Sequence, residues 1–131
     1  MPEGFAETFI AALRDLEENS NADRIASLFA DDCRVGNSAM GRVLEGPDGA
    51  REFWTNYRKS FGEIHSDFRN KIVSGNTAAL EWVSEGTAPD GNNIQYAGVS
   101  IVQSDGVKIN RFFAYFDPNS LGVQISESAR A

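Results

Sequence analysis

The sequence predicts an α+β domain in which three N-terminal helices pack on one face of a strongly curved, mostly antiparallel sheet. The first observation behind this prediction is a change of period. Apolar residues recur at helical spacing up to Phe61 and alternate from Ile64 onward. The second is the segment Ile94–Pro118, where two long apolar runs flank Asp105-Gly106, a typical hairpin turn. A sheet curled around the helices would form a conical barrel, whose apolar interior could bind a small ligand.

Length and composition limit the classes of protein and partner. We expect residues 1–131 to form one domain, with a partly flexible tail at 119–131. The net charge of −7 argues against nucleic acid or an anionic membrane as a partner. The sequence lacks a signal peptide and a membrane-length apolar run, so we expect a cytoplasmic protein. One cysteine, Cys33, and one histidine, His65, cannot form an internal disulfide or a zinc site, and we expect no metal or cofactor.

Three amphipathic segments predict the helices, because their apolar residues recur at three- and four-residue spacing. The first carries the stripe Phe5, Phe9, Ile10, Leu13 and Leu16. The second, which Ser20 or Asn21 caps and Asp31-Asp32 closes, carries Ile25, Leu28 and Phe29. The third begins at Gly46-Pro47, since proline suits a first helical turn. Its stripe is the clearest in the chain and comprises Ala50, Phe53, Trp54, Tyr57 and Phe61.

Alternation of apolar and polar residues predicts the strands. Two short strands are expected between the helices, at Cys33–Val35 and near Arg42–Leu44. Four long antiparallel strands follow the third helix, at Ile64–Val73, Ala78–Thr87, Ile94–Gln103 and Val107–Phe116. The last two are too long and too apolar for an exposed edge, so we expect them in the middle of the sheet.

Three segments, LFADDCRV, GPDGAREFW and IVQSDGVKINRFFAYFD, follow one another along the chain. Together they resemble the nuclear transport factor 2-like superfamily, in its SnoaL-like branch, and the resemblance in order and spacing covers residues 5 to 118. The resemblance implies the cone-shaped fold described above. It does not imply one activity, because the superfamily includes steroid isomerases, epoxide hydrolases, polyketide cyclases, dehydratases and non-catalytic binding modules.

Neither of two catalytic patterns of these relatives is present. A steroid isomerase of this kind uses a tyrosine, an aspartate base and a protonated aspartate. By the resemblance, the corresponding positions hold Phe9, Asn37 and Val99. The epoxide-hydrolase pattern needs an arginine and two aspartates. By the resemblance, the corresponding positions in this chain hold Trp82, Ser84 and Ala114. The resemblance therefore implies an interior without the catalytic groups of either enzyme.

The resemblance also places a set of side chains on the predicted interior. The predicted ligand-binding residues are Phe9, Asn37, Trp54, Tyr57, Trp82, Ser84, Val99, Asn110, Phe112 and Ala114. Trp82 either stacks on a ligand or fills the core, and a β-bulge would exchange it for Glu81. Asn37 either lines the pocket or closes an Asx-turn. His65 is expected to face solvent or an interface, with a general base as the alternative, and Asp117 to bind backbone N–H groups or an arginine.

Two functions of different classes are consistent with these observations. The first is a SnoaL-like protein whose pocket binds a small apolar or aromatic molecule. If it is an enzyme, we expect a cofactor-independent isomerase, cyclase, dehydratase or hydrolase with unassigned catalytic residues. The alternative is a non-catalytic, dimeric interaction or scaffold module with a filled interior. Apolar residues on both faces of the strands, such as Trp82 and Val83, predict a homodimer through the outer sheet face.

Overall fold

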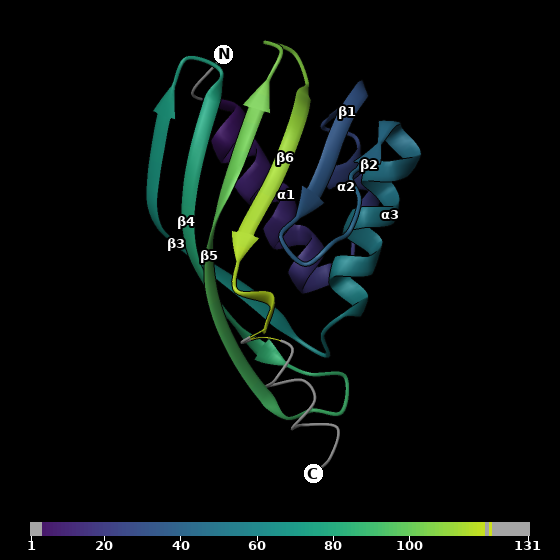
Figure 1. Cartoon of the computed structure of the whole chain (residues 1–131), viewed down its shortest axis with the longest axis vertical. Coiled ribbons are helices and arrows are strands. Elements are labelled where there is room, and N and C mark those ends of the chain that lie inside the picture. Colours follow the sequence, from purple (N-terminus) through teal and green to yellow (C-terminus); the bar gives the residue numbers. More distant parts are fainter. Residues whose placement is uncertain (1–3, 120, 122–131) are drawn as a thin grey trace.

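The computed structural model describes residues 4–119 and residue 121, and over these residues three helices precede most of the sheet (Figure 1). Helix α1 (Gly4–Asn19) buries one side, where the apolar stripe lies. Helix α2 (Ala22–Ala26) is short, and the Asn21 side chain caps it by accepting a hydrogen bond from the backbone N–H of Arg24 at 3.3 Å. Helix α3 (Gly46–Lys59) has Pro47 in its first turn, as the sequence predicts. No helix within the described residues is long and apolar enough to cross a membrane.

In the described part of the chain, six strands form one mixed sheet with the order β2-β1-β6-β5-β4-β3. Their bounds are β1 (Phe29–Asn37), β2 (Leu44–Glu45), β3 (Ile64–Ser74), β4 (Thr77–Thr87), β5 (Asn93–Ser104) and β6 (Ile109–Phe116). The pairing of β1 with β6 is parallel, and the other four pairings are antiparallel. The two strands of the last hairpin, β5 and β6, lie in the interior of the sheet, as predicted.

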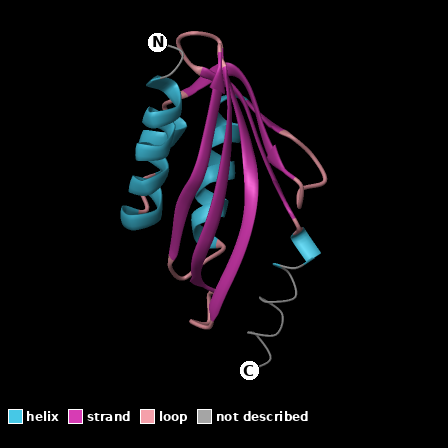
Figure 2. Ribbon diagram, turned by 90° about the vertical axis from the view of Figure 1, so that its left-hand side faces the viewer, coloured by secondary structure: helices cyan, strands magenta, loops and turns pink. Residues whose placement is uncertain are grey.

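The sheet is open and not strongly curled (Figure 2), which corrects the expectation of a strongly curved conical barrel. A barrel closes only when its two edge strands pair with each other. Among the described strands the edges are β2 and β3, and they stand at opposite ends of the sheet order. The α+β class and the helices before the long strands are as predicted.

The region after α2 differs most from the sequence prediction. The second helix ends at Ala26, so that Leu28 and Phe29 are not helical and Asp31-Asp32 lies on β1. The reason is a distant partner: the backbone N–H of Ile109 donates to the carbonyl of Leu28 at 2.8 Å, and Phe29 pairs with Ile109. A nine-residue strand therefore replaces the predicted Cys33–Val35.

The final hairpin is shorter on its second side than predicted. The Asp105 carboxylate accepts hydrogen bonds from the backbone N–H groups of Val107 and Lys108 at 2.8 and 2.7 Å. Gly106 has a φ of +99°, a conformation that favours glycine. The turn therefore extends through Lys108, Val107 is 88% exposed, and β6 begins at Ile109.

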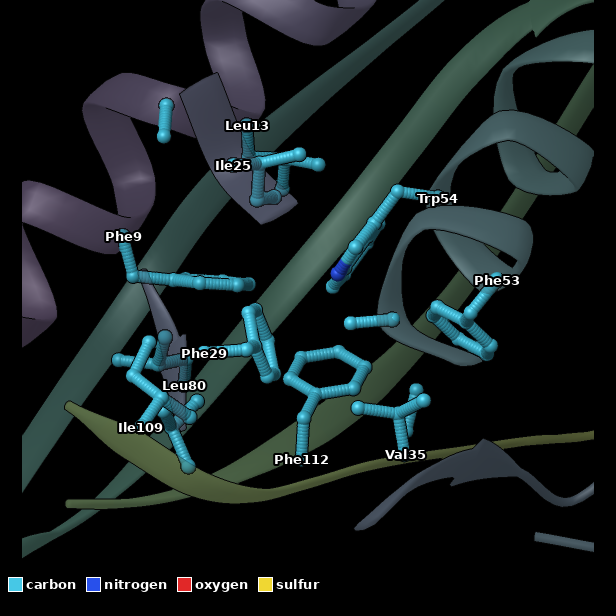
Figure 3. Packing of buried hydrophobic residues seen from close by; sticks show 14 of the residues in the cluster. Phe9, Leu13, Ile25, Phe29, Val35, Phe53, Trp54, Leu80, Ile109 and Phe112 are labelled. Carbon is cyan, nitrogen blue, oxygen red and sulfur yellow. The ribbon is translucent and has the colours of Figure 1, made fainter. Parts of the chain in front are cut away.

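The main hydrophobic core joins the helices to the inner face of the sheet (Figure 3). Aromatic rings dominate its centre. The ring centroid of Phe112 lies 4.9 Å from that of Trp54 and 5.3 Å from that of Phe9, in tilted and edge-to-face arrangements that aromatic pairs favour. A second, smaller cluster around Phe61 and Ile64 includes Leu121, and the remainder of the predicted tail lies outside the described residues, apart from Asn119.

Candidate functional site

A cavity of about 510 Å³ lies between the helices and the inner face of the sheet. Residues from α1, α3, the loop after β1 and strands β3 to β6 line it. Its wall is mostly apolar and rich in aromatic residues, which are Phe9, Phe53, Trp54, Tyr57, Phe61, Phe68, Trp82, Tyr96, Phe112 and Phe116. An apolar concave site of this size is typical of small-molecule binding.

Eight of the ten predicted pocket residues line this cavity: Phe9, Asn37, Trp54, Tyr57, Trp82, Ser84, Phe112 and Ala114. The other two, Val99 and Asn110, are not among the described residues of its wall. Val99 pairs with Glu81 and Tyr115 and lies on the outer face of the sheet, whereas its neighbour Ser100 faces inward.

A β-bulge explains the position of Asn110. On the neighbouring strand Gln103 pairs with Arg111, but Ser104 pairs with Ile109, so Asn110 is an extra residue without a cross-strand partner. Ile109 and Phe112 lie three positions apart, and in a regular strand they would face opposite sides of the sheet. The extra residue lets both side chains face inward. Asn110 is thereby displaced from the inner face.

Strand β4 places its residues by regular alternation. Leu80, Trp82 and Ser84 are buried, whereas Glu81 and Glu85 are exposed. The Trp82 ring has room because residue 98 on the adjacent strand is glycine. A Cβ at Gly98 would lie 2.8 Å from this ring. Trp82 donates a hydrogen bond from its indole Nε1 to Ser100 Oγ at 2.9 Å.

Three other residues with alternative predictions are placed as follows. Asn37 closes an Asx-turn and also lies at the cavity. Its side-chain oxygen accepts a hydrogen bond from the backbone N–H of Ala39 at 2.9 Å, and the residue lines the cavity. His65 is exposed on an edge strand. Asp117 accepts a hydrogen bond from the backbone N–H of Asn119 at 3.0 Å.

A buried carboxylate, Glu17, stands behind the cavity wall and is absent from the sequence-based prediction. Glu17 is 4% exposed. Its Oε2 accepts hydrogen bonds from the Tyr57 hydroxyl at 2.8 Å and the Ser66 hydroxyl at 2.6 Å, and its Oε1 accepts from the Ser66 backbone N–H at 3.0 Å. Ser66 Oγ in turn lies 2.7 Å from Ser84 Oγ. Tyr57, Ser66 and Ser84 all line the cavity, so this network connects the cavity to the carboxylate.

The sequence did contain a signal for this carboxylate. Glu17 follows Leu13 by four residues and Phe9 by eight, which places it on the apolar stripe of the first helix. A charged residue on a buried stripe is seldom found without a polar partner. Its partners Ser66 and Ser84 lie far along the chain, and their hydroxyls give no pattern that identifies them.

Burial and the Glu17 charge keep the nearby phenols protonated. Burial first, and then the charge of Glu17, raise the pKa of Tyr57 well above its usual value. The same two causes, in the same order, raise the pKa of Tyr96, whose ring also lines the cavity. Tyr57 therefore acts as a hydrogen-bond donor toward Glu17 at neutral pH.

Trp54 presents a buried donor without a hydrogen-bond partner within the described part of the chain. The residue is 2% exposed and its Nε1 makes no hydrogen bond there. The indole nitrogen is turned toward the rings of Phe9, Phe29 and Phe112 (Figure 3), which can accept only weakly. Buried indole N–H groups usually have a partner.

The outer part of the cavity wall is more polar. Arg42, from the loop after β1, forms an ion pair with Glu52 of α3 at 3.5 Å, and both residues line the cavity. Glu52 is the one carboxylate among the described lining residues. The side chains described here form no cluster of three or more metal ligands of the His, Cys, Asp or Glu type.

Comparisons with known proteins identify the fold. Residues 6–112 match the family model of the SnoaL-like domain. No curated protein matches the chain by sequence. An NTF2-like protein from Anabaena variabilis ATCC 29413 superposes with a TM-score of 0.81 at 18% identity, with 92% of each chain covered.

Two further solved structures have this fold. An LEH-like epoxide hydrolase from M. tuberculosis has a TM-score of 0.74 at 13% identity and covers 98% of this chain and 94% of its own. TerC, co-crystallised with polyporic acid, has a TM-score of 0.78 at 18% identity and covers 99% of this chain and 98% of its own. At such low identities, these likenesses show a common fold and no common activity.

Proposed function

We propose, since the chain belongs to the SnoaL-like domain family, that its cavity binds a small apolar or aromatic molecule. The observation that carries this proposal is the open cavity of about 510 Å³ with an aromatic wall. A scaffold module, the alternative from the sequence, needs no such space. The co-crystallisation of TerC with polyporic acid supports small-molecule binding by this fold.

The proposal extends to catalysis without a cofactor. The fold is shared with an epoxide hydrolase, so it supports chemistry on small molecules in at least one relative. In this chain the cavity combines an apolar wall with one hydrogen-bonded network that ends in the Glu17 carboxylate. An isomerase, cyclase, dehydratase or hydrolase of this type would move a proton rather than an electron or a hydride.

We expect bromobenzene to quench the intrinsic fluorescence of the protein in a saturable manner. Both tryptophans of the chain, Trp54 and Trp82, line the cavity, so the whole tryptophan signal reports on its contents. Trp54→Phe and Trp82→Phe should each retain the response of the remaining tryptophan. Ala114→Phe, which fills the cavity with a ring, should weaken binding about tenfold, or by about 1.4 kcal/mol.

The control is the same substitution at an exposed site. Ala11→Phe on α1 adds the same ring outside the cavity, where Ala11 is exposed, and should leave the titration unchanged. Quenching that rises linearly without saturation, or that is equal in Ala114→Phe and the unaltered protein, would count against a binding cavity.

We further propose that the protein is a homodimer through the outer face of the sheet. Within the described residues, the three helices α1, α2 and α3 pack on the inner face. The outer face carries the apolar residues Ile72, Ala79, Val83, Ala97, Val99, Ile101, Phe113 and Tyr115. Tyr115 is 47% exposed and Ile72 60% exposed. The family resemblance implies that the same face of a second copy of the chain covers this large apolar surface.

Light scattering at micromolar concentration should give the mass of a dimer. Val99 lies at the centre of the outer face, so Val99→Lys should shift the protein toward the monomer, because it places a charge in the apolar contact. Val107→Lys is the matched control, since Val107 is 88% exposed in the hairpin turn. A monomer mass for the unaltered protein would contradict the proposal.

A further inference from the structure

The hydrogen bonds around Glu17 determine the direction of the hydroxyl protons in the cavity wall. A carboxylate can only accept hydrogen bonds. The Ser66 hydroxyl, 2.6 Å from Glu17 Oε2, therefore donates its proton to Glu17. Ser84 Oγ lies 2.7 Å from Ser66 Oγ, and since the Ser66 proton is already engaged, Ser84 must be the donor in this contact. The protons thus point in sequence from Ser84 to Ser66 to Glu17.

This direction makes the Ser84 and Tyr57 oxygens in the cavity wall acceptors. Ser84 Oγ directs its proton toward Ser66 Oγ and has lone pairs left for a ligand. Tyr57 is in the same state, because its hydroxyl donates to Glu17 at 2.8 Å. Ser84 is 1% exposed and Ser66 is 4% exposed, so bulk water does not compete for these groups. A ligand satisfies these two oxygens only if it brings a hydrogen-bond donor.

We propose that Ser84, Ser66 and Glu17 form a proton relay that receives the proton of a hydroxylated aromatic ligand, a phenol or an aromatic enol. The proposal rests on the proposed function of the cavity and names its ligand class. The aromatic wall binds the ring, and Ser84 accepts the ligand hydroxyl. Glu17 does not touch the ligand and acts through the two serines.

The relay step conserves atoms and charge. The ligand O–H bond breaks and its proton bonds to Ser84 Oγ. The Ser84 proton moves to Ser66 Oγ, and the Ser66 proton moves to Glu17 Oε2. The products are a ligand oxyanion, two neutral serines and a neutral Glu17. Such a step activates the ring for proton transfer chemistry and needs no cofactor.

A second observation points to an oxygen-bearing ligand. The Ser100 hydroxyl, in the same cavity wall, accepts from Trp82 Nε1 at 2.9 Å and keeps its own proton for donation. The cavity therefore combines an acceptor group at Ser84 with a donor at Ser100, which suits a ligand that carries both a hydroxyl and a second oxygen.

The test uses two probes of nearly equal shape, 2-naphthol and 2-methylnaphthalene. The unaltered protein should bind 2-naphthol, with the naphtholate emission of a deprotonated excited probe. Ser84→Ala should leave the affinity for 2-methylnaphthalene unchanged, lower the preference for 2-naphthol about tenfold and abolish the naphtholate emission of the bound probe. Glu17→Gln should also abolish this emission, because the relay then lacks its terminal acceptor.

The controls separate the relay from the cavity. Glu18→Gln changes the exposed neighbour of Glu17 on the same helix and should behave like the unaltered protein. If both probes bind, but Ser84→Ala changes neither the preference nor the emission, the relay is overturned and the binding cavity stands. If neither probe binds the unaltered protein, the proposed function itself fails. Should Glu17→Gln not fold, the result with Ser84→Ala decides the question by itself.

Discussion

Glu17→Ala is expected to lower the free energy of unfolding by about 2–4 kcal/mol. The substitution leaves the Ser66 backbone N–H and the Tyr57 hydroxyl without their acceptor, and each buried unsatisfied donor costs about 1–3 kcal/mol. The Ser66 hydroxyl loses less, because it can turn toward Ser84. Relief from burying a charge acts in the opposite direction, so the net loss lies below the sum of the hydrogen-bond terms.

The sheet offers no replacement for the hydrogen bond that the Ser66 backbone N–H loses in Glu17→Ala. β3 is an edge strand, so the N–H groups that point away from β4 have no neighbouring strand to accept them. Glu17 accepts one of these bonds from α1.

Urea unfolding measures this effect, with Glu18→Ala as the matched control. Glu18 is the exposed neighbour of Glu17 on α1, and its substitution should change stability by no more than about 0.5 kcal/mol. Equal midpoints for Glu17→Ala and Glu18→Ala would show that the buried network contributes nothing to stability.

The second large effect is an absence of activity: the protein should catalyse neither steroid isomerisation nor epoxide hydrolysis at the level of its relatives. Loss of one oxyanion donor costs about 10²–10³-fold in rate, and loss of the general base about 10²–10⁴-fold. Phe9, Asn37 and Val99 offer no carboxylate and no acidic donor in place of the isomerase groups. We therefore expect a deficit of about 10⁴-fold or more, although such losses are not additive.

The structure strengthens this expectation. The Asn37 side-chain oxygen is occupied by the Ala39 N–H, and Val99 is on the outer face. A shift of the alignment does not supply a base either, because Asp31, Asp32 and Glu45 are exposed and absent from the described cavity wall.

Epoxide opening is expected to fail for a related reason. The reaction needs a base for water and an acid for the epoxide oxygen. Trp82, Ser84 and Ala114 stand at the positions where the resemblance places the charged groups of such an enzyme. The proposed relay through Ser84 supplies an acceptor of hydroxyl protons and no acid.

Assays with 5-androstene-3,17-dione and limonene oxide decide both cases, with the buffer reaction as the baseline. If the protein turns over either substrate, and Asn37→Ala or Ser84→Ala abolishes that turnover, the positional assignment of these residues is wrong.

The family was predictable from the sequence because its signals are local. The spacing of Phe53, Trp54 and Tyr57 identifies the third helix, and the alternation of Leu80, Trp82 and Ser84 identifies the inner face of β4. The match of residues 6–112 to the SnoaL-like domain confirms the resemblance. Each of these signals depends on residues within a few positions of one another, where helix and strand geometry alone decide which side chains share a face.

Tertiary structure decided the features that join distant segments. Phe29 belongs to a strand because β6, some 80 residues later, pairs with it in parallel. Asn110 leaves the inner face because one extra residue in β6 shifts its register against β5. Glu17 meets Ser66 across 49 residues of chain, and Ser66 meets Ser84 across 18. Periodicity determines which face of an element is apolar, but the contacts of a polar group depend on how separate elements pack, and no local pattern encodes those distances.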